Sequence, residues 1–365
     1  MGLPKSLVAR LAAEGITEPT PIQTHAIPPA LDGRDVIGLA QTGTGKTAAF
    51  GLPLVAIMAQ LDRPGPKGAR GLVLAPTREL AGQIAETLRA YVQGTPMKVA
   101  LVVGGQSLSA QSKRLERGVD LLVATPGRLI DLLDRGAVTL SKTRFLVLDE
   151  ADQMLDLGFI HALRKIAALL PKTRQTMLFS ATMPKQMNEL AASYLTDPVR
   201  VQVNPPGKAA DKIAQSVHFI AKAEKPALLI ELLDGHRDDL ALVFARTKHG
   251  AERLMKQLDR AGFAAASIHG NKSQGQRERA LRAFRNAEAR VLVATDVAAR
   301  GIDIPDISHV IQYEPPDDLE AYIHRAGRTG RAGASGVAIM LVNHNERRMV
   351  TRIPGRVWTA LWTRT

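Results

Sequence analysis

A glycine-rich loop followed by lysine and threonine is the first segment that could bind a phosphate. Ala40–Thr47 reads AQTGTGKT and separates the apolar run Val36–Leu39 from the apolar segment Ala48–Leu61. Between a strand and a helix, glycines let backbone N–H groups face phosphates, and the helix N-terminus adds a favourable potential. Lys46 would then neutralise the β- and γ-phosphates, and Thr47 would hold Mg²⁺. An ordinary glycine turn is the alternative, which the offset of the lysine and threonine disfavours.

Two acidic residues directly follow another apolar run. Asp149 and Glu150 come after Phe145–Leu148, and α/β sheets bind ligands at the carboxyl ends of such buried strands. Asp149 could therefore hold Mg²⁺, and Glu150 could orient or deprotonate an attacking water. The solvated start of a helix is the alternative. The glycine loop upstream favours the catalytic interpretation.

Short, continuous apolar runs separated by segments of helical period predict the scaffold around these residues. Continuous rather than alternating apolar strands indicate a parallel sheet covered on both faces. The expected strands are Val36–Leu39, Leu72–Ala75, Val99–Val103, Leu121–Ala124, Phe145–Leu148, Met177–Phe179, Leu240–Ala245, Ala264–Ile268, Val291–Ala294, Val310–Gln312 and Ala338–Val342. The pattern is interrupted at Asn204–Asp211, which is rich in Pro and Gly and reads as a linker. We therefore expect domains at 1–203 and 215–365, joined by a linker at 204–214.

Composition restricts the function classes. At 365 residues the chain is long for a single core, and its net charge of +13, shared by both halves, favours a polyanionic partner. No cysteine is present, so disulfides are excluded and a cytoplasmic location is expected. No apolar run is long enough to span a bilayer. We expect no membrane association.

Residues Asp149–Asp152 spell DEAD, and further segments follow the motif order of the DEAD-box RNA helicases. These segments are Pro19–Gln23, Ala40–Thr47, Pro76–Leu80, Gly104 with Gly105, Thr125–Arg128, Ser180–Thr182, Val243–Lys248, Gln276 with Arg279, Ala294–Asp303 and His324–Arg331. The chain resembles this family from Gly15 to about Val342. The resemblance implies an α/β fold of two tandem RecA-like domains. His269–Gln274 and the basic surface most resemble the bacterial RhlE-type branch.

The resemblance also implies an ATP site with Mg²⁺. Its catalytic residues would be Lys46, Asp149, Glu150, Arg328 and Arg331, with Mg²⁺ on Thr47 and Asp149. Its nucleotide-binding residues would be Gln23, Ala40, Gln41, Thr42, Gly43, Thr44, Gly45, Lys46, Thr47 and Asp303. The Gln23 amide offers a donor and an acceptor to the adenine edge, although a glutamine can also simply cap a turn. Arg328 and Arg331 would project from one face of a helical turn as arginine fingers.

RNA contacts follow from the same resemblance. They would come from Arg78, Gly105, Thr125 and Arg128 in the first domain and from Thr247, Arg279 and Thr295 in the second. Such residues suit phosphate and sugar contacts, which position a strand without reading its sequence. Only 4% of residues are aromatic, which disfavours a base-stacking platform. ATP state and unwinding would be coupled by Asp152, Ser180, Thr182, Arg300 and His324.

The function implied is RNA-stimulated ATP hydrolysis coupled to interdomain closure and to local, non-processive unwinding of short duplexes or remodelling of ribonucleoproteins. Two alternatives remain: an ATP-gated RNA clamp or annealing factor, and another P-loop machine such as a DNA translocase or protein-remodelling ATPase. Partners would be RNA and ribosome-assembly or RNA-decay complexes, and a monomer is expected. The family's adenine-stacking aromatic would fall upstream of Met1, so we expect an adenine site without that ring. The segment Ile353–Thr365 matches no expected element.

Overall fold

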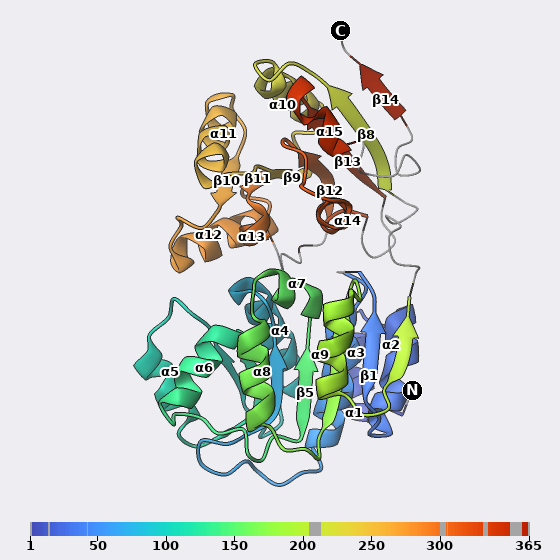
Figure 1. Ribbon diagram of the computed structural model, residues 1–365, viewed down its shortest axis with the longest axis vertical. Helices are drawn as coiled ribbons and strands as arrows, with labels where there is room; N and C mark the ends of the chain where they lie inside the picture. The colour runs from blue at the N-terminus through green and yellow to red at the C-terminus, as the bar shows by residue number, and fades with distance from the viewer. Residues whose placement is uncertain are drawn as a thin grey trace. The chain divides into compact units, whose positions relative to one another are not determined.

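The chain folds as two α/β units. The structure, a computed structural model, describes residues 2–13, 15–41, 43–203, 213–299, 304, 306–330, 335–350 and 360–363. The units are Met1–Pro206 and Gly207–Thr365 (Figure 1). The first strand of the second unit begins at Ile213, two residues before the expected start of the second domain at 215; residues 204–212 lie outside the described part.

A parallel sheet forms the centre of the first unit. Its strands are β1 (Val36–Leu39), β2 (Ala69–Leu74), β3 (Val99–Val102), β4 (Val119–Ala124), β5 (Phe145–Leu148), β6 (Gln175–Ser180) and β7 (Val199–Gln202). Within the described residues this sheet has seven strands in the order β3-β4-β2-β5-β6-β1-β7. Every recorded pairing is parallel. The carboxyl ends of all seven strands therefore meet at one edge.

Helices cover both faces of this sheet. They are α1 (Lys5–Ala13), α2 (Pro21–Leu31), α3 (Lys46–Met58), α4 (Arg78–Val92), α5 (Leu108–Leu115), α6 (Pro126–Asp134), α7 (Ala151–Asp156), α8 (Ile160–Leu169) and α9 (Lys185–Tyr194). In β2, Val73 packs in one core with α1 to α4, whereas Leu72 and Leu74 pack in the other with α5 to α9. Burial on both faces explains the continuous apolar runs.

The second unit repeats this architecture. Its strands are β8 (Ile213–Phe219), β9 (Leu240–Phe244), β10 (Ala265–Ile268), β11 (Val291–Ala294), β12 (Ile307–Gln312), β13 (Gly336–Val342) and β14 (Ala360–Thr363). In the part of the chain that is described, the order is β10-β11-β9-β12-β13-β8-β14 and all recorded pairings are parallel. The strand β14 lies in the C-terminal segment to which no element was assigned from sequence.

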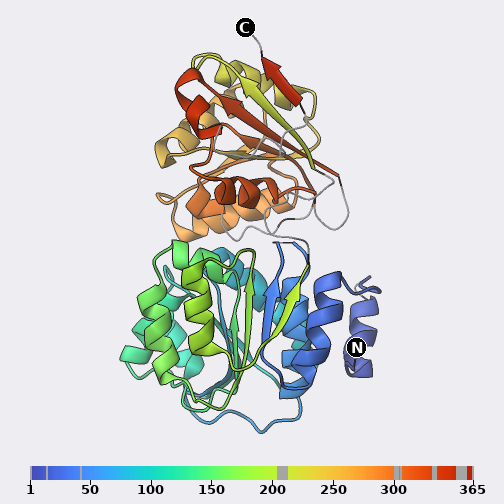
Figure 2. The same cartoon turned by 45° about the vertical axis from the view of Figure 1, so that its right-hand side comes forward.

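The helices of the second unit also divide between two faces, as Figure 2 shows from a second direction. They are α10 (Lys225–Asp234), α11 (Lys248–Arg260), α12 (Gln274–Arg285), α13 (Asp296–Ala299), α14 (Leu319–Ala326), the 3₁₀ helix His344–Glu346 and α15 (Arg347–Val350). Ala241 and Val243 of β9 face the core formed with α10 and α11, and Leu242 and Phe244 face the core formed with α12 and α13. The expected fold class is confirmed.

A buried lysine fastens the 3₁₀ helix to the second sheet. Lys225 is 2% exposed, and its Nζ donates to the Leu341 carbonyl (2.8 Å) and to Glu346 Oε2 (2.7 Å). Burial lowers the pKa of Lys225, and Glu346 opposes that shift.

Nowhere in the described residues is a helix long and apolar enough to cross a bilayer.

Candidate functional site

The glycine loop connects β1 to α3 at the carboxyl edge of the first sheet. Gly43 and Gly45 have φ of +82° and +89°, left-handed values that glycine adopts without strain. Gly45 is the N-cap of α3. The Thr44 hydroxyl donates to the Gln41 carbonyl (2.7 Å) and closes the loop; Thr42 lies outside the described residues. The loop therefore ends directly at a helix N-terminus, where backbone N–H groups lack helical partners.

Lys46 is the first residue of α3, and its side chain is buried. It is 5% exposed, and among the described residues its Nζ has no hydrogen-bond partner. Leaving an ammonium buried and without a hydrogen bond costs several kcal/mol, about as much as losing one partner of a buried ion pair. An anion bound in the loop would remove that cost. Thr47, the next residue, is partly exposed beside it.

Asp149 and Glu150 lie at the end of β5. Both are 2% exposed. Burial raises the pKa of Asp149 to about 7, although the nearby Lys46 ammonium acts in the opposite direction. A buried carboxyl with a raised pKa next to a second buried acid is an environment that a bound divalent cation suits. Glu150 has φ +50°, a conformation rare outside glycine that functional sites often retain.

Asp152 connects the DEAD segment to the Ser180–Thr182 segment. Its Oδ2 accepts from the backbone N–H groups of Ala181 (3.0 Å) and Thr182 (2.9 Å) and from the Thr182 hydroxyl (3.1 Å). The Asp152 N–H in turn donates to Ser180 Oγ (3.3 Å), and that hydroxyl donates to the Thr182 carbonyl (2.7 Å). The structure brings these three expected coupling residues into one network. A displacement of either segment would therefore disturb the hydrogen bonds of the other.

Gln23 joins α2 to the glycine loop. It is 7% exposed. Its Oε1 accepts from the Thr20 N–H (3.0 Å), and its Nε2 donates to the Gly45 carbonyl (3.2 Å). A side chain at Gly45 would collide with this amide. Gln23 therefore caps its own helix, as one of the two sequence interpretations held, and it retains one further donor and one acceptor among the described contacts.

The four expected RNA residues of the first unit surround one loop. A Cβ at Gly104 would lie 2.9 Å from an Arg78 guanidinium nitrogen, and Arg128 Nη1 donates to the Gln106 carbonyl (2.9 Å). Gly105, between them, has φ +78°. Thr125 is the N-cap of α6 and is 8% exposed. Two guanidinium groups and a left-handed glycine thus shape a surface that suits a phosphate backbone.

In the second unit, the expected RNA residues come from two strand ends and one helix. Thr247 follows β9 as the N-cap of α11, and its Oγ1 accepts from the Gly250 N–H (3.0 Å). Thr295 follows β11, and its N–H donates to the Ile268 carbonyl (3.3 Å). Arg279 is exposed on α12. No recorded contact among the described residues joins these three side chains.

A bidentate ion pair that sequence reasoning missed organises the arginine-rich segment. Arg325 is 4% exposed; its Nε and Nη2 each lie 2.6 Å from an Asp296 carboxylate oxygen. Its Nη1 donates to the Glu314 carbonyl (2.8 Å). Arg325 thus ties the segment after β11 to the segment after β12. A basic residue next to His324 was the only sequence signal, and it carried no information about a partner so far along the chain.

Arg328 lies beyond the end of α14. It is 2% exposed, and its Nε donates to the His324 carbonyl (3.2 Å). Because α14 ends at Ala326, Arg328 lies in the turn that follows the helix, where its N–H donates to the Arg325 carbonyl (3.1 Å); that Arg328 and Arg331 share one face stays a prediction. Arg331, Arg300 and Asp303 lie outside the described residues. A cavity of about 140 Å³ is lined by Asp296, His324, Arg325 and Arg328, among others.

Comparison with known proteins identifies the family. The family model described as DEAD/DEAH box helicase matches residues 20–190, and the helicase conserved C-terminal domain matches residues 224–333. A solved DEAD box protein from the hyperthermophile Methanococcus jannaschii is 35% identical, with a TM-score of 0.58, over 100% of this chain and 98% of that one. The chain belongs to the DEAD-box RNA helicase family. It is therefore an enzyme of the ATP-hydrolysing RNA helicase class.

Further structures of DEAD-box proteins are similar to this helicase. S. cerevisiae Dbp5 bound to RNA and ADP BeF3 is 31% identical, with a TM-score of 0.86, over 100% of this chain and 94% of that one. Mss116p bound to ssRNA and AMP-PNP is 28% identical, with a TM-score of 0.90, over 100% and 78%. Each unit of the helicase thus has the RecA-like fold, and the two follow in tandem along the chain, as the family resemblance implied.

Proposed function

We propose that this helicase binds ATP with Mg²⁺ on its first unit, hydrolyses it in response to RNA, and uses closure of the two units to separate short duplexes locally. The observation that carries this proposal is the Lys46 ammonium, which is buried at the start of α3 and has no hydrogen-bond partner among the described residues. A triphosphate in the glycine loop would satisfy it. The buried carboxyls of Asp149 and Glu150 lie beside it.

Each group around the loop has a defined task in this scheme. Lys46 holds the β- and γ-phosphates, and Gln23 presents its remaining donor and acceptor to adenine. Thr47 and Asp149 would hold Mg²⁺, which when bound neutralises phosphate charge. Glu150 orients the attacking water and accepts its proton. Arg328, with Arg331 and Asp303, would complete the site from the second unit.

RNA is proposed to bind through its backbone. Arg78 and Arg128 flank the Gly105 loop in the first unit, and Thr247, Thr295 and Arg279 supply contacts in the second. Their guanidinium, hydroxyl and backbone groups suit phosphate and sugar rather than base edges. Two of the similar proteins named above, Dbp5 and Mss116p, were solved with RNA. Affinity should depend strongly on salt and weakly on sequence.

Coupling is proposed to run through the Asp152 network. Asp152 lies two residues after Glu150, and its carboxylate holds Ala181 and Thr182. A shift of the catalytic acid would therefore be transmitted to the Ser180–Thr182 segment, and Arg300 and His324 would respond in the second unit. We further propose a cytoplasmic monomer of the RhlE-type branch acting in ribosome assembly or RNA decay.

The test measures steady-state ATP hydrolysis with a single RNA and with DNA of the same sequence. A second assay measures displacement of a short labelled strand from a duplex. We expect stimulation by RNA alone, ATP-dependent displacement, and loss of hydrolysis in Lys46→Met, which keeps the length of the buried side chain. Equal stimulation by DNA would contradict the choice of nucleic acid. Hydrolysis without displacement would favour the ATP-gated clamp, and wild-type hydrolysis by Lys46→Met would contradict the phosphate site.

A further inference from the structure

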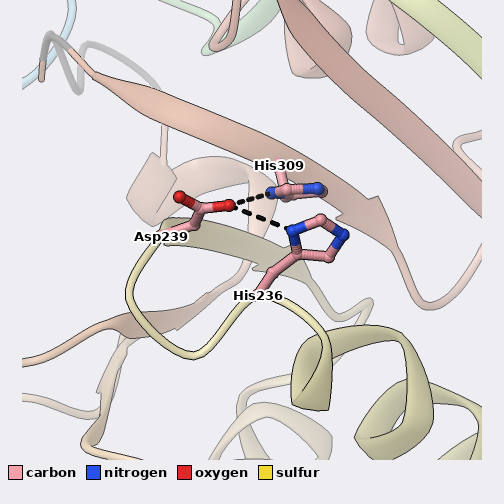
Figure 3. Close-up of side chains that lie close together, drawn as sticks. All are labelled: His236, Asp239 and His309. Atoms are coloured by element: carbon pink, nitrogen blue, oxygen red, sulfur yellow. Dashed lines mark hydrogen bonds and ion pairs between the residues drawn. The ribbon is translucent and has the colours of Figure 1, made fainter.

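Two histidines and an aspartate lie close together near the amino ends of strands in the second sheet. The threonines proposed for RNA binding follow the carboxyl ends. His236 lies in the turn after α10, Asp239 immediately precedes β9, and His309 is the third residue of β12. Figure 3 shows both imidazoles facing the same Asp239 carboxylate. The candidate residues Thr247 and Thr295 follow the opposite ends of the strands. Neither nucleotide nor RNA binding therefore explains this cluster.

The distances within the cluster suit a metal ion. Asp239 Oδ2 lies 3.1 Å from His236 Nδ1 and 3.8 Å from His309 Nδ1, and one ligand atom from each residue lies within 4.8 Å of the others. Bonds of about 2.0–2.2 Å to a tetrahedral Zn²⁺ separate two ligand atoms by about 3.3 Å. Small rotations of the two exposed side chains would therefore bring all three ligand atoms onto one ion.

The backbone already holds the three residues in place. The His236 N–H donates to the Leu233 carbonyl (3.0 Å), and the Asp239 N–H donates to the His236 carbonyl (3.1 Å). Arg290 Nη1 fastens the same turn through the Asp238 carbonyl (2.5 Å). His309 lies in β12, between β9 and β13. A site assembled in advance on rigid elements loses little entropy when it binds.

Burial differs among the three in a way that leaves the site accessible. His309 is 6% exposed, whereas the side chains of His236 and Asp239 are 48% and 45% exposed. The two imidazole rings lie 4.1 Å apart at their centroids. An ion could enter from solvent and still contact a buried ligand.

The Ser308 hydroxyl contacts the same His309 nitrogen. Ser308 Oγ lies 2.8 Å from His309 Nδ1 and also donates to the Leu240 carbonyl (3.1 Å). When Ser308 donates its single proton to the Leu240 carbonyl, Ser308 Oγ can only accept from His309 Nδ1, which must then carry a proton. A metal on Nδ1 would replace that proton, as zinc does when it binds histidine.

We propose that His236, Asp239 and His309 form a binding site for a divalent transition-metal ion of the zinc type, with water in the remaining position. Two nitrogen ligands and one carboxylate suit Zn²⁺, Ni²⁺ or Co²⁺, whereas Mg²⁺ prefers oxygen ligands alone. Bound metal links the turn between α10 and β9 to β12 and so stabilises the second unit. The proposal is independent of the ATP and RNA scheme, because it uses none of the same residues.

The test is isothermal titration of the full-length, tag-free protein with Zn²⁺, and with Mg²⁺ as the comparison ion. We expect one saturable Zn²⁺ site per chain, no Mg²⁺ binding at that site, and a rise in the unfolding temperature of the second unit with Zn²⁺. His236→Ala and Asp239→Ala alter exposed side chains, so both variants should fold. Each should weaken Zn²⁺ binding by at least about tenfold and abolish the thermal shift.

His249→Ala is the matched control, because His249 is an exposed histidine of the same unit outside the cluster. It should leave Zn²⁺ affinity unchanged. Substitution with Co²⁺ supplies a spectroscopic readout: visible d–d absorption should appear in the wild type and disappear in His236→Ala. Absence of saturable Zn²⁺ binding would overturn the proposal, as would unchanged affinity in both cluster variants or an equal loss in His249→Ala.

Discussion

The two units place different chemistry on the same order of strands. Strands β1 to β7 and β8 to β14 occupy corresponding positions in their sheets. A glycine loop and a buried lysine follow β1, whereas 220–224 follow β8 without a glycine. Asp149 and Glu150 follow β5, whereas Tyr313 and Glu314 follow β12. Among the described residues, the glycine loop and the pair of acids therefore have no counterpart at the matching strand ends of the second unit, even though the scaffold occurs twice.

Threonines follow equivalent strands in both units. Thr77 and Thr247 follow β2 and β9, and each caps a helix by accepting an N–H from the residue three positions on. Thr125 and Thr295 likewise follow β4 and β11, and each donates its N–H to the neighbouring strand segment. Thr125 and Thr295, both proposed for RNA, thus follow equivalent strands, whereas the residues proposed for ATP chemistry differ between the two units.

A large difference in hydrolysis rate should separate variants of the two strand-end glutamates. Glu150→Gln keeps shape but removes the proposed base, so kcat for RNA-stimulated hydrolysis should fall by roughly 10²–10⁴, with ATP and RNA still bound. Glu314→Gln is the matched change in the second unit; its Oε2 accepts the Arg246 N–H (2.5 Å), which an amide oxygen can also do. Its hydrolysis rate should stay near that of the wild type. Equal losses in the two variants would remove the distinction between the units.

A stability difference should come from the ion pair that the second unit has at its carboxyl edge. Asp296→Ala leaves the buried Arg325 without its carboxylate and should lower the free energy of unfolding of the second unit by about 2–4 kcal/mol. The exposed pair of Asp234 with Arg237 supplies the control, and Asp234→Ala should cost less than about 1 kcal/mol. Urea denaturation followed separately in each unit measures both. Similar costs for the two variants would contradict the structural role of Arg325.

The repeated helix caps should show equal, smaller effects. Thr77→Ala and Thr247→Ala each remove a side-chain acceptor at a helix N-terminus, so each should destabilise its own unit by about 1 kcal/mol. Thr→Ser at either position should restore most of the loss, because serine also caps. Calorimetry of the four variants checks this. A cost confined to one unit would show that the two threonines are not equivalent.

The smallest effect concerns acid stability of the second unit. Burial alone would raise the pKa of Glu252, but hydrogen bonds from Ser267, His269 and Lys272 lower that pKa to about 2. A carboxyl with a depressed folded pKa stabilises the fold above its unfolded pKa, near 4.5, and loses that contribution as pH falls towards 2. The free energy of unfolding of the second unit should therefore be about 1 kcal/mol higher in the wild type than in Glu252→Gln at about pH 7. Solvent screening keeps this difference small.

Unfolding measured across about pH 2–7 for both proteins gives the difference directly. It should shrink below pH 4.5 and vanish near pH 2. A difference that does not change with pH would show that Glu252 acts through packing instead of charge.

Strands with continuous apolar runs were predictable from sequence, including the edge strands β3 and β10. Strands β2, β5 and β11 are buried on both faces, so their residues form such runs. The unpredicted β7 and β8 consist mostly of partly buried or exposed residues. Their weaker patterns resemble those of loops, because one face or one edge meets solvent.

Site residues were predictable where the chemistry lies within one short segment. The spacing of residues within the glycine loop and within the DEAD segment is enough to indicate phosphate and metal binding. Contacts between distant segments did not follow from spacing, as with Gln23 at the Gly45 carbonyl and Arg325 at Asp296. The end of α14 at Ala326, two residues before Arg328, did not follow from spacing either. Such contacts depend on which strand ends the sheet order brings together.

In the proposed scheme the first unit binds ATP and Arg328 of the second unit is needed for its hydrolysis. The most direct measurement compares the ATP Kd with the single-turnover hydrolysis rate in wild type and Arg328→Ala, with RNA saturating. For Arg328→Ala we expect an ATP Kd close to that of the wild type and a hydrolysis rate lower by roughly 10³–10⁵, as for other arginine fingers. Loss of ATP binding with an unchanged rate per bound ATP would contradict the proposed scheme.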